Sequence, residues 1–552
     1  SQNIYWLTAD ERPGLRLSTR DGTPAGSAPT PLHFPATVHA EVNDYYWQTM
    51  PNGEGQDHYF WGDPLIAPES REYTVSLNQI STTARAATVR VRLKGRSQDR
   101  SADPDHHTRL SLGGIVIDDG RWDGQSNYDH EVVVPHSDLR EGVNQIQVET
   151  LGDTAASVDQ VLVNWIEVNY WRTYVAENDG LNFRAPEAGR FQFEIAGFSR
   201  PEVQVFDVTD SANVVLITQA TVVRDGRSYS VRFQDTAQAE TRYLALTPAA
   251  HRRPASLQLD QPSSWKSPRQ GADYIIITPE EFYTNSLKLA NHRSASGLRV
   301  ATVKVEDIYD EFNEGIFHPQ AIRDFLSYAY HNWVGPAPTY VVLVGDATLD
   351  YKDNLQTGTV NYVPSQIVQT DILGETPSDN WFVLVSGDDI LPDMFIGRLS
   401  AQTSSEVDDI VDKIIQYEQD PPSESWNQNV LLVADDDSLL FEALSESLAD
   451  VLPSGYLADK IYVRRYPPGN PTTDIVDAIN GGRLLVQYAG HGNANRWGLW
   501  DGNRRFIFNQ SDLTSLNNIQ KWPVVAVANC VNGYFTGPRT LVCIAEAFLR
   551  LR

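Results

Sequence analysis

The alternation of short apolar runs with helical segments after residue 272 is the feature that most constrains how this chain can fold. The runs are rich in β-branched side chains, as buried strands are, and they lie at 274–277, 300–305, 340–344, 430–434, 461–463, 484–487 and 524–529. Helical segments separate them, and one begins with Thr403 and Glu406 as a capping box before an apolar stripe. This alternation predicts right-handed crossovers and one α/β domain with a mainly parallel sheet.

Two of the predicted strands end on reactive side chains. Residues 484–487 lead into Gly490, His491 and Gly492, and residues 524–529 lead into Cys530. Because the carboxyl ends of parallel strands meet at one edge of an open α/β sheet, where binding sites form, we expect His491 and Cys530 to meet there.

This pair has the chemistry of a cysteine nucleophile and its base. A nearby imidazole lowers the pKa of a thiol and later protonates the leaving amine. We expect the main-chain N–H groups of Cys530 and Gly492 to hold the oxyanion, since glycine allows a close approach of the backbone. The alternative is a buried structural cysteine and a turn histidine. For Cys543, in an apolar helical segment, we predict core packing.

Several ordered motifs resemble those of the gingipain family of cysteine peptidases, over about residues 270–552. They are Ala-Gly-His-Gly at 489–492, Arg-Trp-Gly at 496–498, Asn-Cys-Val-Asn-Gly-Tyr-Phe at 529–535, Tyr-Val-Val-Leu-Val-Gly-Asp at 340–346, Ser-Asp-Asn at 378–380, Ile-Gly-Arg at 396–398 and 475–482. The resemblance implies a caspase-like fold, His491 as base and Cys530 as nucleophile. With its N-terminal β-region, the chain is similar to the large secreted members, which include a signal peptidase of the type IX secretion system.

The resemblance also implies an acidic residue after an earlier strand that supports the histidine. The matching position is Asp435, Asp436 or Asp437, and the alternative for each is a solvated or calcium-binding acidic turn. Trp497 is expected to wall the substrate cleft, with a core position as the alternative.

Further positions carry weaker expectations. Asp346 and Asp379 are predicted to cap turns rather than bind calcium. Members of the family that cleave after basic residues have an acidic side chain low in the specificity pocket. Here Leu440 or Phe441 is expected near that position, so specificity for Arg or Lys is not implied.

The first half of the chain is predicted to be all β. We expect an irregular segment over 1–57, a jelly-roll-like β-sandwich over 58–174, a small β-domain over 175–248 and a proline-containing linker over 249–272, before the peptidase domain at 273–552. His106 and His107 are predicted to be solvated loop histidines rather than metal ligands, because no residues with ligand spacing lie nearby.

Composition limits the partners. The 552 residues are too many for one hydrophobic core. A formal net charge of −28 argues against nucleic acid and anionic membranes as partners, although clustered carboxylates leave structural calcium open. Two cysteines cannot form a disulfide framework. No run reaches the length of a membrane span, and no signal-peptide pattern opens the sequence.

These observations predict a secreted or cell-surface cysteine endopeptidase that acts on protein or peptide substrates without a cofactor in its chemistry. One alternative is a sortase-like transpeptidase or signal peptidase of the same family, and another is a surface structural or adhesive protein with a vestigial peptidase domain. Relative to the family, the domain is expected to lack its last strand and helix, which raises its own C-terminal fragment as a partner alongside attachment to the cell surface.

Overall fold

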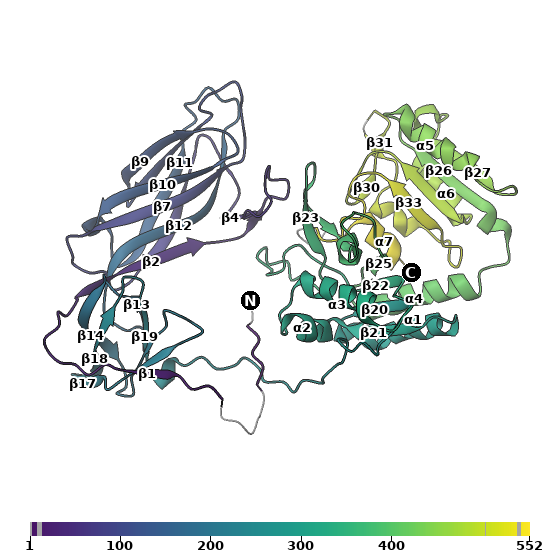
Figure 1. Cartoon of the computed structure of the whole chain (residues 1–552). Helices are drawn as coiled ribbons and strands as arrows, with labels where there is room; N and C mark the ends of the chain where they lie inside the picture. The colour runs from purple at the N-terminus through teal and green to yellow at the C-terminus, as the bar shows by residue number, and fades with distance from the viewer. Residues whose placement is uncertain (1–2, 8–13, 503, 538–541, 552) are drawn as a thin grey trace. The chain divides into compact units, whose positions relative to one another are not determined.

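The computed structural model describes residues 3–7, 14–502, 504–537 and 542–551, and the chain forms two compact units. The first unit, Leu7–Trp47 with Asp57–Leu259, is built of strands (Figure 1). The second is Asp260–Arg552 with Ser1–Trp6 and Gln48–Gln56, and it contains the α-helices of the described chain. The boundary at Asp260 lies within the predicted linker. None of the helices in the described ranges has the length and apolar character needed to cross a membrane.

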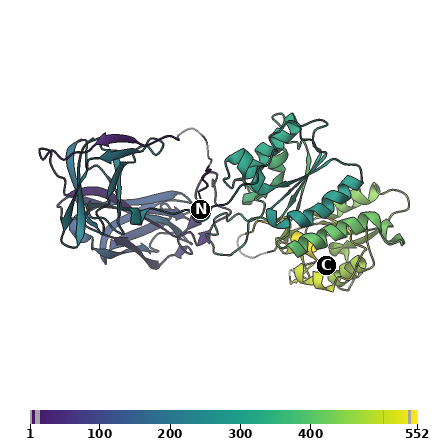
Figure 2. The same ribbon diagram turned by 90° about the horizontal axis from the view of Figure 1, so that it is seen from below.

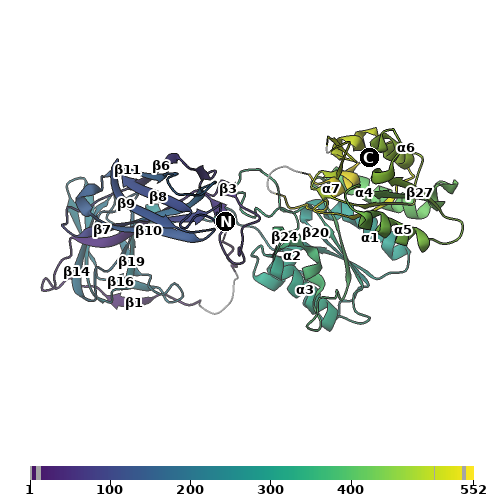
Figure 3. The ribbon, with the colours of Figure 1, turned by 90° about the horizontal axis from the view of Figure 1, so that it is seen from above.

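Two antiparallel sheets of the first unit share one apolar core. Their strand orders are β10-β7-β12-β2 and β6-β11-β8-β9. Alternation along β7 turns Val89, Val91 and Leu93 inward, where they meet Ile146 and Val148 of β11 in one buried cluster. The two sheets therefore pack face to face as a β-sandwich (Figure 3). The strands are β2 (His33–Glu41), β6 (Glu69–Leu77), β7 (Ala86–Gly95), β8 (His106–Leu112), β9 (Ile115–Trp122), β10 (Asn127–Pro135), β11 (Gly142–Thr150) and β12 (Gln160–Thr173), with β3 (Tyr45–Tyr46), β4 (Tyr59–Phe60) and β5 (Leu65–Ile66) beside them.

A second pair of sheets covers the predicted small β-domain. Their orders are β1-β16-β15-β19-β13 and β14-β18-β17. Aromatic side chains fill the core, where Phe193 stacks on Phe233 and Phe183 stacks on Tyr243. The strands are β1 (Ser18–Asp21), β13 (Gly180–Arg184), β14 (Gly189–Phe198), β15 (Gln204–Asp207), β16 (Val215–Thr218), β17 (Thr221–Asp225), β18 (Ser228–Ala237) and β19 (Arg242–Leu246).

The prediction of an irregular segment over residues 1–57 is wrong. β2 pairs with β12 through a register that places Val38 opposite Val168, and β1 pairs with β16. Both partners lie more than a hundred residues away, so the local abundance of Pro, Gly and Thr hid strands that only distant pairing stabilises.

The prediction of solvated loop histidines at His106 and His107 is also wrong. Both lie on β8 and are buried. His106 Nδ1 is 2.6 Å from Asp159 Oδ1, while the two ring nitrogens of His107 lie 2.6 Å from Asp153 and 2.7 Å from Asp119. Polar side chains far along the chain thus make these buried positions acceptable.

The second unit contains a first parallel sheet of order β21-β20-β22-β25. Ile275 and Ile277 of β20 point to the face that packs with Ile322 and Phe325 of α3, and Ile276 points to the opposite face. Helices lie on both faces (Figure 2), which explains why the strands are apolar throughout. The elements are β20 (Tyr274–Thr278), α1 (Tyr283–Ala295), β21 (Val300–Lys304), α2 (Val305–Asn313), α3 (Pro319–Asn332), β22 (Tyr340–Val344), β23 (Gln366–Thr370), β24 (Gly374–Ser378), β25 (Phe395–Leu399) and α4 (Ser404–Gln419).

The remaining strands form a second parallel sheet of order β27-β26-β28-β33. The predicted parallel α/β architecture is therefore confirmed, but its strands divide between two four-stranded sheets rather than one. The elements are β26 (Asn429–Ala434), α5 (Leu439–Asp450), β27 (Leu457–Tyr462), α6 (Pro471–Asn480), β28 (Leu485–Ala489), β29 (Gly492–Asn493), β30 (Arg496–Trp497), β31 (Leu499–Trp500), β32 (Arg505–Phe506), β33 (Val524–Ala528) and α7 (Ile544–Arg550).

Candidate active site

Strand register places His491 and Cys530 at one edge of the second sheet. β28 and β33 are parallel neighbours, and Ala489 lies opposite Ala528. His491 and Cys530 each follow this pair by two residues. Because neighbouring strands are about 4.8 Å apart, the chain delivers both residues to the carboxyl edge of the sheet side by side.

Asp435 holds the main chain at His491. It follows β26, and its buried carboxylate accepts hydrogen bonds from the N–H groups of His491 and Asp436, both at 2.8 Å. The hydroxyl of Tyr488 lies 3.1 Å from the same carboxylate and 2.7 Å from the His491 carbonyl oxygen. Burial and the charge of Asp435 raise the pKa of Tyr488 well above its ordinary value, so this hydroxyl keeps its proton. Asp435 therefore fixes the backbone of His491, not its ring.

Asp437 is the carboxylate beside the imidazole. Its Oδ2 lies 3.5 Å from His491 Nε2. The side chain of Asp437 is 60% exposed and that of His491 is 62% exposed. The ring of Phe441, at the start of α5, packs edge-on against His491 with centroids 5.5 Å apart. With Nε2 turned toward Asp437, the ring presents Nδ1 as its second nitrogen. Of the three predicted supports, the structure thus places only Asp437 beside the imidazole.

The three adjacent carboxylates form a compact acidic group. One oxygen from each of Asp435, Asp436 and Asp437 lies within 4.8 Å of the others, a grouping found among the described residues. Burial, together with the charges of Asp435 and Asp437, raises the pKa of Asp436. Asp435 already accepts bonds from protein donors, and calcium takes about six to eight oxygen ligands. The group therefore provides too few free ligands for calcium by itself, and structural calcium stays a prediction.

Cys530 and Cys543 occupy opposite environments. Cys530 is exposed, whereas Cys543 is fully buried at the start of α7. Burial and the nearby charge of Glu546 raise the pKa of the Cys543 thiol to about 12. Cys543 therefore stays protonated and unreactive, and its predicted core position is confirmed.

The backbone turns sharply immediately after Cys530. Val531 has φ of 52°, a left-handed conformation that β-branched residues rarely adopt. The turn closes with a hydrogen bond of 3.1 Å from the Tyr534 N–H to the Val531 carbonyl oxygen. Strained backbone of this kind persists only when its surroundings fix it, and it is frequent at functional sites.

Gly492 lies where no side chain fits. A Cβ atom at this position would be 2.3 Å from Asn529 Nδ2 and 3.2 Å from Asn532 Nδ2. The segment after His491 therefore approaches the segment around Cys530 closely, as the prediction for the main-chain N–H of Gly492 requires. That the N–H groups of Gly492 and Cys530 bind an oxyanion stays a prediction.

Trp497 does not wall an open cleft. Its side chain is 1% exposed and stacks on Tyr488 with ring centroids 4.4 Å apart, with Phe508 on another side. The predicted role in the substrate cleft is therefore wrong, and the alternative core position is correct. Its contribution is to hold Tyr488, and through it the main chain at His491.

Asp346 accepts a hydrogen bond from the Ala347 N–H at 2.9 Å, as a turn cap would, but Asp346 and Asp379 are also ion-pair partners. Asp346 is buried and lies 2.9 Å from Arg550, while Asp379 accepts from Arg398 through two bonds of 2.8 Å. The two partners are 204 and 19 positions away in the sequence, so local turn patterns could not predict either pair. Leu440 is 76% exposed, and of the two predicted pocket residues only Phe441 contacts His491.

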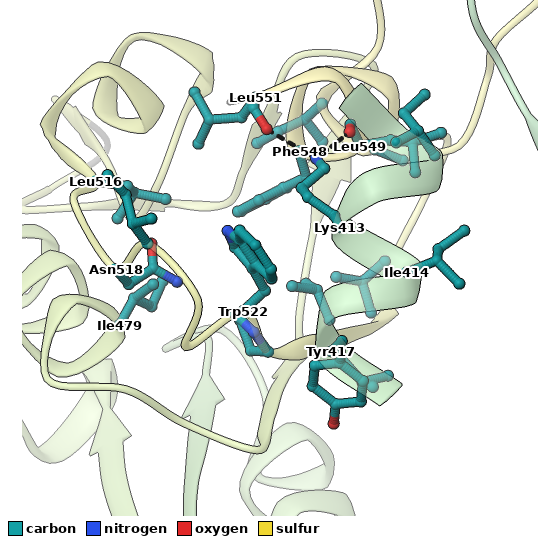
Figure 4. Close-up of a pocket in the computed structure, with 18 of the residues that line it drawn as sticks. Lys413, Ile414, Tyr417, Ile479, Leu516, Asn518, Trp522, Phe548, Leu549 and Leu551 are labelled. Atoms are coloured by element: carbon teal, nitrogen blue, oxygen red, sulfur yellow. Dashed lines mark hydrogen bonds between the residues drawn. The ribbon is translucent and has the colours of Figure 1, made fainter. Parts of the chain in front are cut away.

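A separate apolar cavity lies between α4, β33 and α7. Its volume is about 410 Å³, and neither His491 nor Cys530 lines it. Lys413 donates hydrogen bonds to the carbonyl oxygens of Leu549 and Leu551, and Trp522 lies among the apolar side chains (Figure 4). Burial lowers the pKa of Lys413 to about 8. Trp497 and Asn532 are among the residues that line it, but neither member of the dyad is, so we assign the cavity no part in the chemistry.

Sequence reasoning missed the polar residues that hold the site together. The sequence patterns assign no role to Tyr488, and they include Asn529 and Asn532 only as letters of a motif. Tyr488 bonds the His491 carbonyl oxygen, and Asn532 bonds carbonyl groups in the segment after His491. Two asparagines around a single cysteine were the available signal, since buried amides need several partners at once.

Comparison with known proteins places this geometry in a family. The family model described as "Peptidase family C25" matches residues 267–552. Gingipain R2 of Porphyromonas gingivalis is 27% identical over 292 residues, covering 51% of this chain and 35% of that protein. Lys-gingipain of the same species is 25% identical over 213 residues, covering 37% of this chain and 12% of that protein.

One solved structure extends the likeness in fold. The structure of dimeric latent PorU from P. gingivalis has a TM-score of 0.54 at 18% identity, and the match covers 75% of this chain and 40% of that one. The structure of the Arg-specific cysteine proteinase gingipain R has a TM-score of 0.41 at 26% identity, and the match covers 53% of this chain and 61% of that one. The chain thus spans about a third or less of the length of the gingipains that it matches.

Proposed function

The chain belongs to peptidase family C25, and on this premise we propose that it is a cysteine endopeptidase with Cys530 as nucleophile and His491 as general base. The observation that carries the proposal is the register of β28 and β33. It delivers an exposed cysteine and an exposed histidine to one sheet edge, each two residues beyond the pair Ala489 and Ala528.

The proposed reaction proceeds through an acyl-enzyme. The Cys530 thiol gives its proton to His491, and the thiolate attacks the carbonyl carbon of the scissile peptide bond. The N–H groups of Gly492 and Cys530 stabilise the oxyanion. His491 then protonates the leaving amine as the C–N bond breaks, and water, activated by the same imidazole, hydrolyses the thioester. No cofactor takes part in these steps.

Each carboxylate near His491 has a separate task in this proposal. Asp437 stabilises the imidazolium that forms when the ring accepts the thiol proton, at the 3.5 Å separation from Nε2. Asp435 keeps the main chain of His491 in place through the 2.8 Å bond to its N–H. With Asp437 beside Nε2 and Asp435 holding the main chain, the imidazole of His491 can turn Nδ1 toward the thiol of Cys530.

We further infer that the protein is secreted or held at the cell surface and acts on protein or peptide substrates. The supports are the family itself and the acidic composition, with a net charge of −28 that disfavours nucleic-acid partners. The two sheets of the β-sandwich would serve to present or attach the peptidase unit.

The test is the reactivity of Cys530. The wild-type protein and the His491→Ala variant are labelled with iodoacetamide between pH 5 and 9, and the rate at Cys530 is followed by peptide mass spectrometry. We expect Cys530 of the wild type to react much faster than Cys530 of the variant below pH 8. Equal rates would overturn the proposal. A casein digest with and without an added amine then shows whether water or the amine takes the acyl group.

A further inference from the structure

We propose that Asn532 is a positioning residue that holds the Cys530 loop (residues 529–537) against the His491 loop (residues 490–498). It sets the distance between thiol and imidazole without touching the substrate. The inference rests on the peptidase function proposed above. Beyond His491 and Cys530, Asn532 is then a third residue on which the reaction depends.

The side chain of Asn532 bonds directly to the other loop. It is 2% exposed, and its Nδ2 donates to the carbonyl oxygens of Asn493 at 2.5 Å and Arg496 at 3.0 Å. Asn493 and Arg496 face each other in the hairpin of β29 and β30, which begins one residue after His491. One amide thus spans both strands of the hairpin and ties them to the residue two places after Cys530.

Asn529 completes the connection from the other side of Cys530. Its Nδ2 donates to Asn532 Oδ1 at 2.6 Å, and the same Nδ2 lies against Gly492. The two asparagines therefore bracket Cys530 in sequence and bond to each other in space. Their amides fill the space that a side chain at position 492 would occupy.

The main chain of Asn532 anchors the loop in a third direction. Its carbonyl oxygen accepts from the Ala545 N–H at 3.2 Å, at the start of α7. Between this anchor and Cys530 stands Val531 with φ of 52°. Bonds to the hairpin, to Asn529 and to α7 therefore hold the strained turn that sets the direction of the Cys530 side chain.

Only an amide side chain of this length suits the position. Asn532 donates two hydrogen bonds and accepts one, whereas an aspartate has no donor and an apolar residue of equal size has neither donor nor acceptor. Loss of the amide leaves the carbonyl oxygens of Asn493 and Arg496 without this donor. The loops would then separate, and a displacement of about 1 Å between reacting groups can lower a rate about 100-fold.

The experiment measures the pH profile of Cys530 alkylation by iodoacetamide in the full-length protein. The variants are Asn532→Ala, Asn529→Ala, His491→Ala and the control Asn518→Ala. Asn518 is equally a buried asparagine that donates to a carbonyl oxygen, that of Lys521 at 3.1 Å, but it belongs to neither loop. Peptide mass spectrometry reports Cys530 alone, and thermal unfolding reports the folded fraction.

We expect Asn532→Ala to slow labelling below pH 8 by about 10- to 100-fold and to move the profile toward that of His491→Ala. Asn529→Ala removes one bond and should move it less, while Asn518→Ala should keep the wild-type profile. With a peptide substrate, kcat should fall more than KM rises. Should Asn532→Ala fail to fold, Asn529→Ala carries the test.

Two results would overturn the inference, and they are distinguishable. If the wild type reacts faster than His491→Ala but both asparagine variants keep the wild-type profile per folded molecule, the asparagines are structural only and the peptidase proposal stands. If the wild type reacts no faster than His491→Ala, the peptidase proposal fails and this inference fails with it.

Discussion

His106 of the β-sandwich and His491 of the peptidase unit both lie beside aspartates, yet their surroundings differ in almost every respect. His106 is fully buried, with Asp159 at 2.6 Å on Nδ1 and the Ser97 carbonyl oxygen at 3.3 Å on Nε2. His491 is 62% exposed and has one carboxylate at 3.5 Å. The first ring has hydrogen-bond partners at both nitrogens, which fix its position. The second keeps a nitrogen for exchange with a thiol, which is what a general base needs.

Two opposing effects set the pKa of His106. Burial alone would lower the pKa, but the hydrogen bond and charge of Asp159 and the charge of Asp105 outweigh it, so the pKa is raised. The hydrogen bond between His106 and Asp159 therefore joins β8 to the residue immediately before β12. Exposure and the number of hydrogen-bond partners therefore distinguish a structural histidine beside an aspartate from one that can act as a base.

The largest expected loss of activity follows substitution of Cys530. His491 has this thiol as its proposed partner, and His106 has none. Cys530→Ala should lower peptidase activity at least about 10⁴-fold, because it removes the proposed nucleophile and Cys543, the other cysteine, is buried. The free energy of unfolding should stay near that of the wild type, since Cys530 is exposed. Hydrolysis of a peptide library and urea unfolding are the measurements. Cys543→Ser serves as control and should show the reverse, with lower stability and activity retained in the folded fraction.

His491→Ala should lower activity about 10²- to 10⁴-fold, the usual contribution of a general base. Stability should change little because the ring is exposed, while Asp435 bonds the main chain and not the side chain. Steady-state kinetics and thermal unfolding of the same preparation separate the two effects. Activity retained at the wild-type level would show that His491, like His106, is not a general base.

His106→Ala should have the complementary result, a loss of stability with peptidase kinetics unchanged per folded molecule. Removing one member of a buried pair leaves Asp159 uncompensated, and such losses amount to roughly 3–5 kcal/mol. Urea unfolding followed by tryptophan fluorescence measures the change, and Trp122 beside His106 is a local reporter. A variant as stable as the wild type would contradict a structural role of His106.

Asp437→Asn should have a smaller effect on activity, less than about fivefold, because solvent screens an exposed pair that contributes about 1 kcal/mol or less. Steady-state kinetics of the variant and of Asp436→Asn, the matched control, measure the effect, and the control should keep the wild-type kcat/KM. A loss as large as that of His491→Ala would show that Asp437 does more than stabilise charge.

The smallest expected effect is the pH dependence of sandwich stability. Because folding raises the pKa of His106, its contribution is fully present below the ordinary histidine pKa of about 6.5 and is lost as pH rises through the folded value. His130 acts in the opposite direction, since burial lowers its pKa and stability falls as pH drops below about 6.5. The stability of wild type relative to His106→Gln should therefore decline between pH 6 and 9. A difference independent of pH would contradict a charged His106.

The sequence predicted elements whose signal is local and missed those that depend on distant partners. The strand over residues 340–344 and the edge position of His491 and Cys530 followed from continuous apolar runs. The strand β2 did not, because its partner β12 begins about 120 residues later. His106 was mistaken for a loop residue for the same reason, since Asp159 is 53 positions away.

Within the site, the reacting residues were predictable and their supports were not. His491 and Cys530 each follow an apolar run and lie in a glycine-containing motif, so the sequence alone identifies them. The separate tasks of Asp435 and Asp437 depend on which carboxylate is buried, and three identical letters in a row do not carry that information. Likewise, Trp497 has the same letter whether it lines a cleft or stacks on Tyr488.

The register of β28 and β33 has a consequence for insertions and deletions. Since Ala489 and Ala528 are fixed opposite each other, the position of each reacting residue depends on the two-residue distance from its own strand. The exposed turns at 501–502 and 519–520 can therefore lengthen or shorten while thiol and imidazole keep their places, because loop closure depends only weakly on length. One residue inserted between Ala528 and Cys530 would instead turn the thiol away from the histidine. In homologous proteins, insertions and deletions should therefore occur in those turns. They should be absent between the end of β28 and His491, and between the end of β33 and Cys530.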